Sequence, residues 1–121
     1  YRDMPDITKH EQALNAAIAA NCAHEQDEFW AYHDQLYDKQ NSLSLSLYKE
    51  IAESLQLDMA LFNQCLEQKK YEAEVKNDLS DGIKFGVSST TTFFINGQKV
   101  PGVIPYQTFV QIIEKAKTLD L

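Results

Sequence analysis

The sequence lacks a long hydrophobic run and any surplus of positive charge. No apolar segment approaches the roughly 20 residues of a membrane-spanning helix, so we expect no membrane span. Eleven Lys and Arg residues face 18 Asp and Glu residues, for a net charge of −7. A nucleic-acid surface would need a basic stripe, so we expect no nucleic-acid partner. With neither repeats nor low-complexity segments, the 121 residues fit one globular domain of ordinary size.

Cysteine is scarce, and its two copies stand far apart. Cys22 and Cys65 are 43 positions apart, and no Cys-x-x-Cys is present. A redox pair needs both thiols within one helical turn and the first thiolate at a helix N-terminus, so we predict no catalytic residue in this chain. The two cysteines predict a structural disulfide between the first and fourth helices in an oxidising compartment. Two buried free thiols are the alternative.

A metal-binding motif is also missing. The zinc signature His-Glu-x-x-His does not occur. His24 and Glu28 are one helical turn apart, but no third ligand follows at a suitable spacing, so a solvated helix face is the preferred interpretation. His33, next to Trp30, is interpreted as a core or boundary histidine. We predict no metal and no other cofactor.

Helical periodicity fills most of the chain before residue 86. The predicted helices cover residues 8–21, 25–37, 44–55, 58–66 and 71–85, and a final helix starts at Pro105. We expect Thr8, Ser44 and Asp58 to cap three of these helices. The aromatic side chains are predicted to form the core, with a peptide-binding groove as the alternative: Phe29, Trp30, Tyr37, Phe62, Phe93 and Phe94.

The stretch from Gly86 to Gly97 predicts a helix end, a polar loop, a strand and a tight turn. Gly86 tolerates the left-handed conformation that ends helices. Residues 92–95 are apolar and have high β propensity, and Asn96-Gly97 is the strongest short hairpin signal. A return strand follows, interrupted by Pro101, which suits a sheet edge or a bulge.

This stretch resembles the C-terminal half of DsbA-like thioredoxin-fold proteins, whose pattern is Gly-Val-x-Gly-Thr-Pro-Thr-Phe-Phe-Ile-Asn-Gly. The matching residues are Gly86, Val87, Thr90, Thr92, Phe93, Phe94, Ile95, Asn96 and Gly97. Ser89 replaces a glycine, and Thr91 replaces the cis-proline of the family. Because cis peptides are essentially confined to proline, we expect a trans bond before Thr91.

The resemblance implies an α/β fold, here an α+β fragment of the thioredoxin-like type. Residues 1–85 would hold the end of a sheet strand and a DsbA-type helical domain, and residues 86–121 the C-terminal ββα unit. The chain begins at Tyr1 without an initiator methionine or a signal peptide, so we expect a processed or trimmed product. The first strands and the Cys-x-x-Cys helix of the resembled fold would then precede it.

The same resemblance implies a function. The chain would be part of a periplasmic or otherwise extracytoplasmic bacterial thiol–disulfide oxidoreductase or isomerase. Its partners would be exported polypeptides with thiols or disulfides and a redox partner protein. Ser89, Thr90 and Thr91 would bind extended substrate by strand addition. The alternative is a non-catalytic peptide-binding or interaction module. The open edge of the hairpin also predicts self-association.

Overall fold

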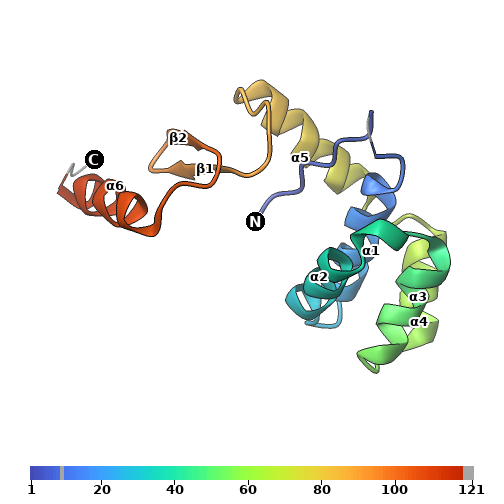
Figure 1. Ribbon diagram of the computed structural model, residues 1–121. Helices are drawn as coiled ribbons and strands as arrows, with labels where there is room; N and C mark the ends of the chain where they lie inside the picture. Colours follow the sequence, from blue (N-terminus) through green and yellow to red (C-terminus); the bar gives the residue numbers. More distant parts are fainter. Residues whose placement is uncertain (9, 119–121) are drawn as a thin grey trace. The chain divides into compact units, whose positions relative to one another are not determined.

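The computed structural model describes residues 1–8 and 10–118 (Figure 1). Two compact units divide the chain: Tyr1–Ser80, called here the helical unit, and Asp81–Leu121, called the hairpin unit. The division falls within the fifth helix, a few residues before the boundary at residue 85 expected from the sequence.

The helical unit is built from five α-helices and one short 3₁₀ turn. They are α1 (Ala13–His24), α2 (Phe29–Asp38), the 3₁₀ turn at Gln40–Ser42, α3 (Leu45–Ser54), α4 (Met59–Glu67) and most of α5 (Glu72–Lys84). In Figure 1, α1 to α4 pack around one another, and the blue N-terminal segment runs past α5. Among the described residues, 1–4 pair with no strand, and the strand end expected there stays a prediction.

Two of the three predicted helix caps are confirmed. The Ser44 side chain accepts a hydrogen bond from the backbone N–H of Leu47, and Asp58 accepts from those of Ala60 and Leu61. Each satisfies a donor that the first helical turn leaves unpaired. The Thr8 cap is wrong, because its hydroxyl donates to Asp6 Oδ1 at 2.8 Å and α1 begins only at Ala13.

Four of the helices end in the same Schellman motif, in which the residue after the helix takes a positive φ. The N–H of Glu28, for example, bonds to the carbonyl of Ala23 across Asp27, which has a φ of 61°. This motif moves the start of α2 from the predicted residue 25 to Phe29. The residues with positive φ at these helix ends are Asp27, Gln56, Lys69 and Gly86.

The core of the helical unit consists of small and branched side chains around three buried rings, those of Tyr32, Tyr48 and Phe62. Tyr32 and Phe62 are fully buried, with ring centroids 5.7 Å apart. The Tyr32 hydroxyl donates to the carbonyl oxygen of Tyr48 at 2.8 Å, and the Tyr48 hydroxyl donates to Gln12 Oε1 at 3.0 Å. Burial raises the pKa of Tyr32 and raises that of Tyr48 to about 12, so both phenols stay neutral donors over the physiological range.

The predicted aromatic core is wrong for most of its members. Phe62 is buried and Phe29 is half-buried, but Trp30 and Tyr37 are each 59% exposed, and Phe93 and Phe94 are also exposed. The inward positions of α2 are taken by Tyr32, fully buried, and Leu36, packed against the core. A helix buries one stripe only, so Trp30 and Tyr37 remain on the other side.

The hairpin unit contains the last turn of α5, an antiparallel hairpin and a helix. Strand β1 (Thr92–Ile95) pairs with β2 (Gln98–Pro101), so that Phe93 faces Val100 and Phe94 faces Lys99. Asn96 and Gly97 have φ values of 49° and 83°, which confirms the predicted tight turn. Helix α6 (Tyr106–Thr118) packs on the hairpin, with the Phe93 and Phe109 rings 4.7 Å apart. The predicted order of helices, hairpin and final helix is confirmed.

Candidate functional site

The loop that precedes β1 contains the predicted substrate-binding residues Ser89, Thr90 and Thr91. All three are exposed. The loop is tied down at both ends: the Thr92 hydroxyl donates to the carbonyl of Ser89 at 2.6 Å, and the N–H of Gly102 donates to the carbonyl of Thr91 at 2.7 Å. The structure therefore presents a short polar backbone segment at the entry to a strand.

The peptide bond between Thr90 and Thr91 is cis, so the expectation of a trans bond is wrong. That expectation applied the preference of an isolated non-proline peptide. In the folded loop, the backbone is also held by the contacts on either side of the bond, from Thr92 to Ser89 and from Gly102 to Thr91.

The start of this loop is positioned by Gly86. Its φ of +80° ends α5, and its carbonyl accepts a hydrogen bond from Lys99 Nζ at 3.1 Å. A Cβ at this position would lie 3.4 Å from the same Nζ. Glycine thus serves the turn, and the ammonium of β2 holds the end of the helix next to the hairpin.

The two cysteines form a disulfide between α1 and α4. Their Cα atoms are 5.9 Å apart, and Cys22 and Cys65 are 1% and 3% exposed. Because the sequence has no other cysteine, the chain carries no free thiol. A thiolate is the nucleophile of disulfide exchange, so none of its side chains can start that reaction while the bond is intact.

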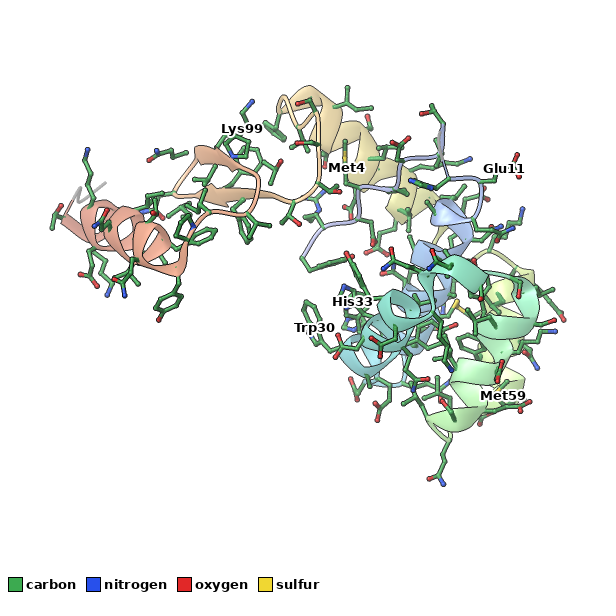
Figure 2. All side chains as sticks on the ribbon, viewed as in Figure 1. Met4, Glu11, Trp30, His33, Met59 and Lys99 are labelled. Atoms are coloured by element: carbon green, nitrogen blue, oxygen red, sulfur yellow. A yellow bond between two sulfur atoms is a disulfide. The ribbon has the colours of Figure 1, made fainter. Side chains whose placement is uncertain are left out.

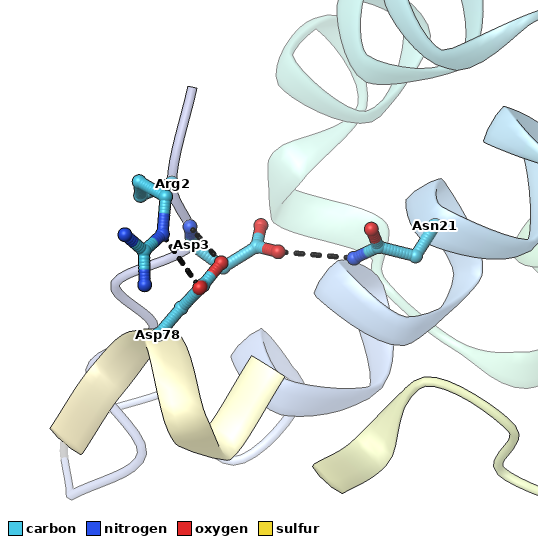
Figure 3. Close-up of polar contacts among 4 residues, drawn as sticks. All are labelled: Arg2, Asp3, Asn21 and Asp78. Atoms are coloured by element: carbon cyan, nitrogen blue, oxygen red, sulfur yellow. Dashed lines mark hydrogen bonds and ion pairs between the residues drawn. The ribbon is translucent and has the colours of Figure 1, made fainter. Parts of the chain in front are cut away.

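A polar network that sequence reasoning missed anchors the N-terminal segment (Figure 3). Arg2 Nε donates to Asp78 Oδ1 at 2.6 Å, and the backbone N–H of Asp3 donates to Asp78 Oδ2 at 3.1 Å. Asn21 Nδ2 donates to Asp3 Oδ2 at 3.0 Å. These bonds join residues 2 and 3 to α5 and α1. An isolated Asp in a short extended segment gives no sequence signal of burial.

Asp3 is the one buried carboxyl group of this network, at 8% exposure. Burial raises its pKa above the ordinary value, and the nearby carboxylates of Asp78 and Glu74 raise it further. The hydrogen bond from Asn21 and the proximity of His33 act in the opposite direction. Asp3 can therefore hold a proton at pH values where an exposed Asp is ionised.

The histidines do not form a metal centre in the part of the chain that the structure describes. No three His, Cys, Asp or Glu side chains gather there closely enough to hold a metal ion. His33 lies among aromatic rings, and its Nδ1 is 3.2 Å from Asp34 Oδ1. Within residues 1–8 and 10–118, no helix combines the length and apolar character needed to cross a bilayer.

Comparison with known proteins relates the chain to much longer proteins named Na(+)/H(+) antiporters. It is 35% identical over 106 residues to Na(+)/H(+) antiporter NhaA 3 of Salinispora tropica, covering 88% of this chain and 16% of that protein. It is 33% identical over 102 residues to NhaA 1 of Salinispora arenicola, covering 84% and 16%. To NhaA of Herminiimonas arsenicoxydans it is 27% identical over 111 residues, covering 92% and 18%. The chain thus spans less than a fifth of these relatives.

No solved structure is significantly similar to the chain. The family model described as Thioredoxin matches residues 1–115, which include the helical unit, the hairpin and most of α6. This match confirms the thioredoxin-like fold expected from the hairpin motif, and on it we conclude that the chain belongs to the thioredoxin family.

Proposed function

We propose that this chain is a portion of an extracytoplasmic, DsbA-like thiol–disulfide oxidoreductase that acts on exported polypeptides. The observation that carries the proposal is the family match over residues 1–115, combined with a polar loop at the entry to β1. By its resemblance to DsbA-like proteins, the loop would serve one reaction together with a redox motif from another part of the chain.

The reaction would divide between two segments. A Cys-x-x-Cys upstream of Tyr1 would supply the thiolate or disulfide, because Cys22 and Cys65 are bonded to each other. A substrate thiolate would attack the Cys-x-x-Cys disulfide, forming a mixed disulfide, and the second substrate thiol would displace the enzyme as a dithiol. A redox partner protein would accept the two electrons and restore the enzyme disulfide.

The loop would hold the substrate beside that motif. Ser89, Thr90 and Thr91 are exposed, and their backbone offers donors and acceptors to an extended polypeptide by strand addition. The buried Cys22–Cys65 disulfide supports an oxidising, extracytoplasmic location such as the bacterial periplasm, since structural disulfides are rare in reducing compartments.

The coding sequence upstream of Tyr1 and a thiol-oxidation assay test the proposal together. A Cys-x-x-Cys should precede Tyr1, and the complete gene product should oxidise a dithiol peptide. The 121-residue chain alone, assayed as the matched control, should not. A complete product without the motif, or with the motif and no exchange activity, would overturn the proposal.

A second candidate is a non-catalytic interaction module. The curated relatives are named antiporters, and the chain matches only 16% to 18% of them, which favours a domain appended to a longer protein. Such a module would bind peptides through the same loop or through the open edge of β1, with no need for a thiol. The upstream sequence separates the candidates, because the module requires no Cys-x-x-Cys.

A further inference from the structure

Five rings form a continuous surface on the outer side of α2, called here the aromatic face: Tyr1, Phe29, Trp30, His33 and Tyr37. The centroids of neighbouring rings in this face lie 4.7 to 5.7 Å apart. The contacts run from Tyr1, which meets Phe29, to Tyr37, which meets His33. All five residues belong to the helical unit. Figure 2 shows Trp30 and His33 on the same side of α2, away from the helical core.

The aromatic face leaves more aromatic surface in contact with solvent than is usual for the solvent-facing side of a helix. Tyr1 is 70% exposed, and Trp30 and Tyr37 are 59% exposed. Tyr32 and Leu36 already fill the inward positions of α2, and Phe29 also packs against the core, so Tyr1, Trp30 and Tyr37 are the rings of this face that stay largely in solvent. A contiguous apolar patch of this kind marks an interaction site, because each ring left in water forgoes the free energy of burial.

Acidic residues outnumber basic ones around the aromatic face, where Arg2 follows Tyr1 and Lys39 follows α2. Residues 24–38, which include α2 and the turn before it, contain five acidic residues and no Lys or Arg. Lys70 pairs with one of them, Glu25. Asp34 lies directly beside the face, with Oδ1 3.2 Å from His33 Nδ1 and a side chain that is 75% exposed.

The net charge of the whole helical unit is also negative. It carries 7 Lys and Arg residues against 15 Asp and Glu residues, a net charge of −8. Arg2, next to Tyr1, is bound to Asp78. A bare aromatic surface in such a field attracts cations, because both the ring faces and the carboxylates favour positive charge.

We propose that the aromatic face is a docking surface for a polypeptide segment in which arginine or lysine alternates with apolar side chains. The cationic groups would stack on Trp30 and Tyr37 and approach Asp34, while the apolar side chains would cover Tyr1 and Phe29. An acidic segment would be repelled by the helical unit. This proposal goes beyond thiol exchange, since it requires no reactive cysteine.

Titration of the 121-residue chain with a capped eight-residue peptide of alternating arginine and leucine tests this proposal. Trp30 is the only tryptophan, so its emission should change saturably as the peptide binds. A glutamate–leucine peptide of the same length should not bind. Affinity should fall as salt is raised, because exposed charges are screened.

Variants measured by calorimetry locate the site. Trp30→Ala should weaken binding about tenfold, through the loss of cation–π stacking, and Trp30→Phe should retain most of the affinity. Asp34→Asn should weaken it mainly at low salt. Tyr106→Ala, which removes a 78% exposed ring of the hairpin unit, is the matched control and should bind as the parent chain does.

Three results would overturn the proposal. The first is equal affinity for the arginine and glutamate peptides, and the second is parental affinity in Trp30→Ala with an unchanged circular dichroism spectrum. The third is concentration-dependent dimerisation that Trp30→Ala abolishes, because the face would then be occupied by a second copy. Thiol-oxidation activity of the complete gene product has no bearing on these outcomes.

Discussion

Breaking the Cys22–Cys65 bond should remove much of the stability of the helical unit. The bond closes a loop of 43 residues between α1 and α4. The chain-entropy relation gives about 4 kcal/mol for a loop of that length. Single domains are stable by only about 5 to 15 kcal/mol, so this loss is a large fraction of the total. For a unit of this size it corresponds to a fall in Tm of roughly 15 to 30 °C.

The comparison of oxidised and reduced parent chain measures this effect most directly. Reduction breaks the cross-link but leaves both buried sulfur atoms in place, so no cavity is added. Thermal and urea unfolding would be followed by the fluorescence of Trp30, which lies in the same unit, and thiol titration would verify the redox state. The Cys22→Ala/Cys65→Ala variant is the control, and reductant should not change its Tm.

One result would refute the reasoning. If the fully reduced chain unfolded within a degree or two of the oxidised chain, the bond would not restrict the unfolded ensemble as calculated. The packing of α1 on α4 would then be sufficient by itself to hold the unit together.

Three further predictions concern other parts of the chain. Asp3→Asn should raise Tm at pH 7, and the gain should shrink as the pH falls toward 3. The pKa of Asp3 is higher in the folded state than its ordinary value of 3.8. The protonated carboxyl group therefore stabilises the fold fully only below pH 3.8, and this stabilisation is lost as the pH rises through the folded-state pKa. A variant equally destabilised at both pH values would contradict this. Phe62→Ala should cost about 3 to 5 kcal/mol in urea unfolding, because its ring is fully buried, whereas Leu61→Ala, 56% exposed, should change stability little. The open edge of β1, which pairs only with β2 in the described residues, should produce concentration-dependent association in sedimentation; a strictly monomeric chain would count against it.

Local signals in the sequence predicted the hairpin unit well. Asn96-Gly97 specifies its turn, since both positions tolerate positive φ, and the apolar run that ends at Ile95 specifies the strand before it. Gly86 marked the end of α5 for the same reason. The sequence did not predict the Schellman ends at Asp27, Gln56 and Lys69, because none of these positions holds the glycine that usually marks such an end.

The candidate site could be predicted only in part from local sequence signals. The position of Ser89, Thr90 and Thr91 before β1 follows from the motif, but the cis bond between Thr90 and Thr91 does not follow from the general preference of non-proline peptides. The Asp3 network joins residues 18 and 75 positions apart, and no local pattern encodes that pairing.

The sequence by itself determined the order of elements, the hairpin turn and the caps at Ser44 and Asp58, because each depends on a few neighbouring residues. Only the tertiary structure decided which aromatic side chains are buried. Periodicity shows that α2 has an apolar side and that aromatic residues lie on two of its sides, but not which side meets the core. Packing selected Tyr32 and left Trp30 exposed, and that selection depends on the shapes of α1, α3 and α4 together.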